Sequence, residues 1–445
     1  MFRPAHKIYD RLEFCGRRQS IEAVSDPAEP THVNGSISCA IHVNSNDKDT
    51  LIAFRDNMKI VKILEQPVRL KSNISNALVN FSTHTVSVVA LVTDKIINGK
   101  PATGLAFNSI GRFDQSDILR NRMIPRLLSA KPGLLINPET EKLCPAKVLK
   151  CAMQNEKPGG HGDRAHAASA LEMAVWDLNA KLEDEPAAIT IARHFGRSLA
   201  IPKISVYAAG GYYHEAAHAQ ALQDELKSYR DSGFTMFKMK IGGAPLDHDL
   251  KRIESALKIV GVGANLAVDA NGRFDLDQAI AYGKAMAPYA LRWYEEPGDP
   301  LDYDLNRQLV DAYDGPLATG ENLFSRQDVK NLLMYAGMRR NQDIFQMDPG
   351  LSYGITEYAA MITEMEKNGY DRKFAYPHGG QLMGFHIVAG LGLGGCEVYP
   401  GVFQPMGGFQ DGAVIENGMA TIPDTPGFGF ERKSNLAVPF AELCS

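Results

Sequence analysis

The sequence has little of what marks several large classes of protein. Its six cysteines are scattered without a CxxC pair, so neither a zinc knuckle nor a disulfide framework is indicated. It contains no run of about eighteen apolar residues and no apolar stretch of a secretory signal near its start, which argues against a transmembrane helix and against secretion. The cytoplasm is therefore the expected location.

A strong charge of one sign is also missing. The formal net charge is −5 over 445 residues, whereas nucleic acids and anionic membrane surfaces attract markedly basic proteins. Hydrophobic residues make up 44% of the chain, which is enough for a large buried core. We therefore expect a protein that acts on a small molecule and binds neither nucleic acid nor membrane. A homo-oligomer is also expected.

Changes in periodicity divide the chain into four parts. Residues 1–57 are polar and irregular, so we interpret them as a flexible extension or as the result of a start codon assigned too far upstream. Early basic residues also suggest a targeting segment, but acidic residues interrupt them. We predict a domain over 58–200, a barrel over 201–400, and a segment over 401–445 that returns to the first domain.

The second part begins with the pattern of a β-hairpin. Runs rich in β-formers at 86–94 and 102–107 flank Asn98-Gly99, a pair typical of tight hairpin turns. Apolar residues then recur at helical spacing over 118–128 and in a longer amphipathic stretch over 165–181. Strands followed by helices predict an α+β capping domain.

The third part alternates short strand patterns with helical segments, which is typical of βα units around a parallel sheet. Six of the predicted strands end on a polar or charged residue, roughly every 26 to 30 residues. They are Phe237–Lys240, Leu266–Asp269, Arg292–Glu295, Leu317–Glu321, Ile344–Asp348 and Phe374–His378. Because all strands of a (β/α)8 barrel end at one mouth, we predict an α/β fold with a modified (β/α)8 barrel and these six groups around one cavity.

Three consecutive predicted strands end on the carboxylates of Asp269, Glu295 and Glu321. Each alone would more commonly be a surface group, but three in register would repel one another in a partly buried mouth unless a cation neutralised them. Because the set contains no Cys or His, oxygen-only ligation favours Mg²⁺ over Zn²⁺, with Mn²⁺ as an alternative.

Two lysines share one face of the predicted strand 237–240, because Lys238 and Lys240 are two residues apart. Their apolar neighbours favour a buried strand with functional lysines over a solvated edge strand. His378 ends the last of the six strands, and Asp348, one βα unit earlier, offers a carboxylate that would orient its imidazole.

Five motifs resemble the enolase superfamily, in its mandelate racemase subgroup, and the resemblance runs from about Met58 to the C-terminus. The motifs are Lys238-Met239-Lys240, Val268-Asp269-Ala270-Asn271, Tyr294-Glu295-Glu296-Pro297, Thr319-Gly320-Glu321-Asn322 and Pro377-His378-Gly379-Gly380. Residues 155–162 and 206–213 look most like the D-tartrate dehydratases of that subgroup.

The resemblance implies a capping domain over the barrel, Mg²⁺ on the three carboxylates, Lys240 as a base, and a His378–Asp348 pair as the acid. It implies dehydration of an acid sugar or hydroxy diacid by a hydro-lyase, as in the conversion of tartrate to oxaloacetate. It also implies substrate-binding roles for Lys157, Asn108, Asn271 and Glu397. Ile110 stands where the tartrate enzymes have a polar residue, which leaves the acid sugar open.

In the chemistry general to this superfamily, Lys240 removes the proton beside the substrate carboxylate while the metal stabilises the charge that develops. The positive charge of Lys238 would favour the neutral form of Lys240, and protonated His378 would donate to the departing β-hydroxyl, giving a 2-keto acid. The same residues could instead racemise or epimerise a 2-hydroxy acid. A non-catalytic barrel is a weaker alternative, because all six strand-end groups are present. A metal-dependent aldolase or hydrolase barrel is also weaker, because the strand ends carry no His-rich metal set.

Overall fold

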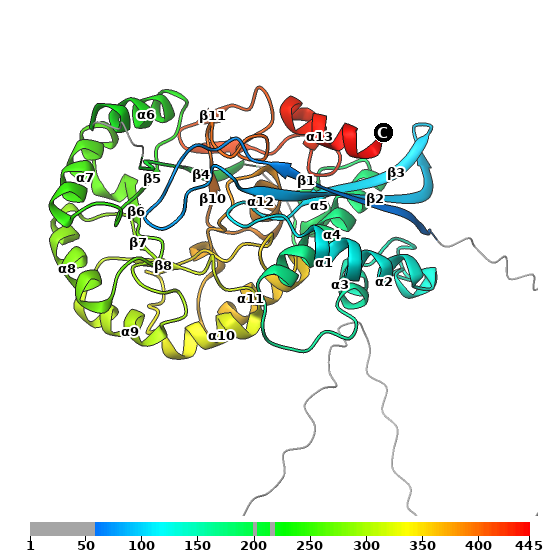
Figure 1. Cartoon of the computed structure of the whole chain (residues 1–445), viewed down its shortest axis with the longest axis horizontal. Helices are drawn as coiled ribbons and strands as arrows, with labels where there is room; N and C mark the ends of the chain where they lie inside the picture. Colours follow the sequence, from blue (N-terminus) through cyan, green and yellow to red (C-terminus); the bar gives the residue numbers. More distant parts are fainter. Residues whose placement is uncertain (1–57, 199–202, 214–218) are drawn as a thin grey trace, which may run out of the picture. The chain divides into compact units, whose positions relative to one another are not determined.

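The structure, a computed structural model, describes residues 58–198, 203–213 and 219–445 (Figure 1). The interpretations of residues 1–57 lie outside the described residues. Within the described ranges, no helix is both long and apolar enough to cross a membrane.

The described chain begins with a three-stranded antiparallel sheet in the order β1-β2-β3. Its strands are β1 (Ile60–Arg69), β2 (Thr85–Ile97) and β3 (Lys100–Phe107). The predicted hairpin is confirmed as β2 and β3, because the turn residues Asn98 and Gly99 have φ values of 51° and 77°, as a tight hairpin turn requires.

Helical segments follow this sheet in the chain, and the structure contradicts the prediction made for one of them. They are α1 (Ser116–Ile118), the π-helical turn Leu119–Met123, α2 (Ile124–Ser129), the 3-10 turn Pro132–Leu134, α3 (Pro145–Ala152), α4 (Asp163–Leu182) and α5 (Ala187–His194). The stretch 165–181 was predicted to be amphipathic, which is wrong: every residue of α4 from Ala165 to Ala180 is buried. The helix lies against β2 and β3 and also packs on α3, α5 and a helix of the barrel, so it has no solvent face.

The second sheet is a parallel barrel whose neighbouring strands follow the order β10-β4-β5-β6-β7-β8-β9. Its strands are β4 (Lys203–Gly210), β5 (Phe237–Lys240), β6 (Leu266–Asp269), β7 (Tyr294–Glu295), β8 (Leu317–Thr319), β9 (Ile344–Phe345) and β10 (Cys396–Val398). A short hairpin, β11 (Ile415–Glu416) and β12 (Met419–Thr421), pairs antiparallel with the start of β4.

Helices alternate with these strands, and α6 to α11 follow one another around the outside of the barrel (Figure 1). They are α6 (Ala219–Asp231), α7 (Leu246–Val260), α8 (Leu276–Met286), α9 (Tyr303–Ala312), α10 (Arg326–Tyr335), α11 (Ile355–Lys367) and α12 (Leu382–Leu391). The last helix, α13 (Ser434–Cys444), contacts β1 and β2. The predicted fold class, a modified barrel with an α+β cap, is confirmed.

The predicted strand Phe374–His378 is wrong. A 3-10 turn ends at Phe374, and Ala375 makes only an isolated bridge to Phe345. Tyr376 N donates to Phe345 O at 2.8 Å and Gly394 N donates to Ala375 O at 3.1 Å, so backbone bonds close the ring without a regular strand. Pro377 lacks an N–H, and Gly379 and Gly380, which follow His378, have positive φ values, so this segment does not continue a regular ladder.

Candidate active site

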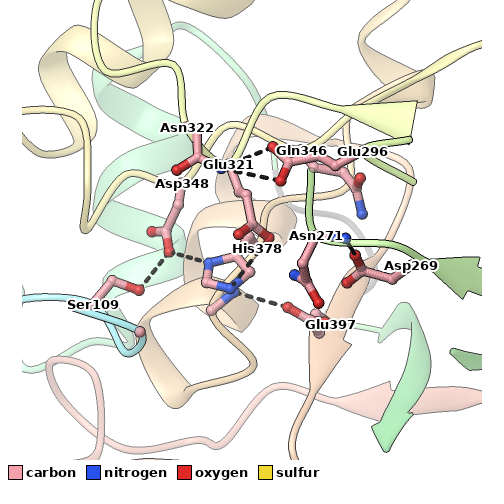
Figure 2. A network of polar contacts seen from close by, with 12 residues as sticks. Ser109, Asp269, Asn271, Glu296, Glu321, Asn322, Gln346, Asp348, His378 and Glu397 are labelled. Carbon is pink, nitrogen blue, oxygen red and sulfur yellow. Dashed lines mark hydrogen bonds and ion pairs between the residues drawn. The ribbon is translucent and has the colours of Figure 1, made fainter. Parts of the chain in front are cut away.

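A cavity of about 290 Å³ lies where the barrel strands end and is covered by loops of the cap. The barrel contributes Lys240 from β5, Glu321 from the loop after β8, and His378. The cap contributes two apolar segments, around Leu78 and around Ile110. Residues from both parts of the fold therefore enclose one site (Figure 2).

The predicted carboxylate triad is confirmed. Asp269, Glu295 and Glu321 each offer an oxygen, and these oxygens all lie within 4.8 Å of one another. The Glu295 carboxylate is held in place because Trp293 Nε1 and Gln346 Nε2 donate to its Oε2 at 2.9 and 2.7 Å. Three clustered carboxylate oxygens without nitrogen or sulfur donors suit a hard divalent cation such as Mg²⁺.

The electrostatics of the triad show that its charges are crowded. Burial and the charge of Asp269 raise the pKa of Glu295 to about 8. Burial alone would raise the pKa of Asp269, but the charges of Lys240 and Lys238 outweigh burial and hold that pKa below its usual range. Without a cation, the proton that Glu295 keeps relieves the repulsion between these two carboxyls.

The two lysines of β5 have different surroundings. Lys238 Nζ lies 2.6 Å from Glu295 Oε1, 2.7 Å from Glu397 Oε1 and 3.4 Å from Asp269 Oδ2, away from the cavity lining. Burial acts against its charge, but Glu295 and Glu397 raise the pKa of Lys238 well above its usual value. Lys240 lines the cavity, with Nζ 2.5 Å from Asp269 Oδ2. Only Lys240 of the pair therefore faces the cavity.

The imidazole of His378 has a partner at each nitrogen. Nδ1 lies 3.0 Å from Asp348 Oδ2, and Nε2 lies 3.0 Å from the Tyr399 hydroxyl and 3.6 Å from Glu321 Oε2. Burial lowers its pKa, but the charge of Glu321 and the hydrogen bond to Asp348 outweigh burial and raise the pKa of His378 to about 9. The ring is therefore a cation near neutral pH and can donate a proton.

Two of the residues that the resemblance implied for substrate binding lie close to the triad. Asn271 lines the cavity in a left-handed conformation, with φ 49°, and its Oδ1 has no hydrogen-bond partner within the described part of the chain. Glu397 is fully buried on β10, where it pairs with Lys238 and accepts from Gly379 N at 3.0 Å. It does not line the cavity.

The other two, Asn108 and Lys157, do not line the cavity either. Asn108 is fully buried, and its Oδ1 accepts from Ser87 N at 2.7 Å, so its side chain holds the start of the loop that carries Ile110 into the cavity lining. Lys157 is exposed on the loop before α4. Neither side chain reaches the site in this conformation.

A polar wall that sequence reasoning did not identify joins cap and barrel. Arg112 in the cap donates to Asn322 Oδ1. Asn322 Nδ2 in turn donates to both oxygens of Glu296, at 2.9 and 3.0 Å (Figure 2). All three line the cavity. Glu296 and Asn322 fall within motifs that carried the resemblance, and this was the signal available; nothing local marked Arg112.

Part of the chain matches a known protein family. Residues 221–435 match the family described as Enolase C-terminal domain-like. The arabinonate dehydratase of Saccharolobus solfataricus is 28% identical over 61% of this chain and 71% of its own length. The L-talarate/galactarate dehydratase of Salmonella typhimurium is 29% identical over 61% of this chain and 64% of its own length.

Solved structures agree with this match. The Salmonella dehydratase, liganded with Mg and L-lyxarohydroxamate, superposes with a TM-score of 0.67 at 21% identity, covering 88% of this chain and 94% of that one. A racemase from Streptomyces coelicolor with bound magnesium has a TM-score of 0.67 at 22% identity, covering 85% and 99%. These likenesses confirm the fold, and the family match over residues 221–435 agrees with it.

Proposed function

We propose that the chain is a magnesium-dependent dehydratase of acid sugars. The observation that carries the proposal is that Lys240 and His378 line one cavity on either side of the carboxylate triad in strand order. A base and a charged acid beside a metal site are what the removal of water from a hydroxy acid needs. The names of the two dehydratase relatives support the same reaction class.

Each residue has a defined part in this reaction. Lys240 takes the proton from the carbon beside the substrate carboxylate. Asp269, Glu295 and Glu321 would hold magnesium, which would supply positive charge where negative charge develops on that carboxylate. His378 gives its Nε2 proton to the β-hydroxyl, which leaves as water, and the resulting enol tautomerises to a 2-keto acid.

Arg112 supports a substrate with a second anionic group, such as a hydroxy diacid of the tartrate type. Its guanidinium lines the cavity and bonds to neutral oxygens of Gly111 and Asn322; none of the described carboxylates forms an ion pair with it. A guanidinium binds a carboxylate well through two parallel hydrogen bonds. Ile110 lines the cavity beside Arg112 and adds an apolar surface there. The screen described next therefore includes both tartrate and longer diacids.

The test is a screen of acid sugars for 2-keto acid formation, with Mg²⁺ and then with EDTA. We expect turnover that EDTA abolishes, and faster turnover of diacids than of monoacids of equal carbon number. The same reactions followed by NMR in D₂O separate dehydration from racemisation, which the structural likeness to a racemase makes the second candidate. A lack of turnover of every acid sugar with Mg²⁺ present would overturn the proposal.

A further inference from the structure

The cap contributes a hydroxyl group directly to the His378–Asp348 pair. Ser109 lies in the loop after β3 and is fully buried, and its Oγ donates to Asp348 Oδ2 (Figure 2). The same oxygen is 3.0 Å from His378 Nδ1, while Gly350 N donates to Asp348 Oδ1 at 2.6 Å. The carboxylate that orients the imidazole is thus held by one group of the cap and one of the barrel.

The backbone around this contact leaves room for it. A Cβ atom at Gly379, whose φ is +121°, would lie 2.9 Å from Asp348 Oδ2 and 3.1 Å from Ser109 Oγ. A Cβ atom at Gly350 would lie 2.8 Å from Ser109 Cβ. Side chains at either glycine would crowd the hydroxyl or the carboxylate, so both positions allow the cap loop to approach Asp348 closely.

We propose that Ser109 is a positioning residue for the acid step of the reaction. Its hydroxyl holds Oδ2 of Asp348 while the Gly350 amide holds Oδ1, so the carboxylate is restrained and the imidazole keeps Nε2 directed at the leaving hydroxyl. Ser109 itself does not line the cavity, unlike its neighbours from Ile110 to Arg112. Lys240 is held instead by Asp269, so the base step does not depend on this contact.

The inference rests on the proposed dehydration. A positioning role for Ser109 predicts that its loss slows expulsion of the hydroxyl but not proton exchange, whereas a general loss of structure would slow both steps. In D₂O, Lys240 exchanges the proton beside the carboxylate, whereas His378 is needed to expel the hydroxyl. For Ser109→Ala we expect product formation to fall roughly 10- to 100-fold, with KM little changed. Deuterium incorporated into recovered substrate, per product formed, should rise by a similar factor.

Two variants separate the hydrogen bond from packing. Ser109→Cys is close in size to serine but is a weak donor, so it should behave like Ser109→Ala. Ser169→Ala is the matched control, because Ser169 on α4 donates to Gly350 O at 2.7 Å and holds the same segment without touching the carboxylate. It should keep the partition between exchange and elimination.

Other outcomes would overturn the positioning role. If Ser109→Ala loses exchange and elimination equally, so that the partition between them is unchanged, the role is wrong. It is also wrong if Ser109→Cys keeps the wild-type partition, or if Ser169→Ala shows the same shift as Ser109→Ala. These results differ from failure of the proposed function, in which the wild-type protein itself would neither exchange nor dehydrate any acid sugar.

Discussion

At the scale of single residues, Lys238 is one buried cation shared by several carboxylates. The sequence indicated that it would tune Lys240, and it does lie beside it on β5. Its ammonium, however, contacts Glu295, Glu397 and Asp269, all of them buried. We therefore interpret Lys238 mainly as the group that makes the clustered carboxylates tolerable in the folded protein.

Replacing Lys238 by methionine keeps most of its volume and removes this charge. Breaking a buried ion pair leaves carboxylates without a partner, which costs about 3–5 kcal/mol. We expect a loss of that size in the free energy of unfolding, measured by urea denaturation of the metal-free protein. Lys251→Met is the control, because Lys251 forms an exposed pair with Asp247 on α7 and should change stability little. Equal stability of both variants would contradict this role.

Sequence reasoning found the residues whose position follows from strand order and missed those brought in by the cap. Asp269, Glu295 and Glu321 could be predicted because parallel strands end at one mouth and three carboxylates there need a cation. Ser109 contacts Asp348 across 239 positions of sequence, and no local pattern indicates such an approach. The same is true of Arg112 in the cavity wall.

At the scale of elements, strand existence was predictable and strand length was not. The predicted bounds of β5 and β6 are those observed. The strands β7, β8 and β9 have only two or three residues, because the chain leaves the ladder early and its polar side chains enter the mouth. The stretch 165–181 was recognised as a helix from its spacing, but only packing on all sides could show that it is buried throughout.

The helices α4 and α11 are joined by one buried carboxylate. Glu172 on α4 accepts from Ile355 N at 2.8 Å and Thr356 N at 3.0 Å, the first amides of α11, and from Trp176 Nε1 at 2.8 Å. A helix N-terminus leaves such amides without partners inside the helix, and a negative charge there is favourable. Glu172 therefore ties the cap to the helix that follows Asp348.

We predict that Glu172→Ala lowers the free energy of unfolding by about 3 kcal/mol or more, because several buried donors lose their acceptor at once. Glu357→Ala is the comparison, because Glu357 lies in the first turn of α11, next to the amides that Glu172 accepts from. Its carboxylate accepts from Arg326 N at a solvent-exposed site, so its loss should lower the free energy of unfolding by under about 1 kcal/mol. Chemical denaturation followed by circular dichroism measures both. Similar losses in the two variants would show that the link between α4 and α11 contributes nothing special.

At the scale of the described molecule, cap and barrel share one hydrophobic core, and the candidate site is built from both. Its clustered carboxylates are a cost to the metal-free fold that a divalent cation removes. Binding to the folded state alone adds stability of about 2.7 kcal/mol at a concentration 100 times Kd. Metal binding should therefore be visible in the unfolding of the whole protein.

This stabilisation should depend on pH, with a sign that follows from Glu295. Burial and the charge of Asp269 raise the pKa of Glu295 to about 8 in the metal-free fold, above its value in the unfolded chain. As the pH rises between the unfolded and the folded pKa, the free energy of unfolding of the metal-free protein therefore falls. Mg²⁺ binds the deprotonated carboxylate, so its affinity should rise from pH 6 to 8 with release of a proton. We expect the increase in Tm caused by Mg²⁺ over EDTA to be larger at pH 8 than at pH 6. In Glu295→Gln the increase should be small at both pH values, and a wild-type shift independent of pH would contradict the assignment of Glu295 as the titrating ligand.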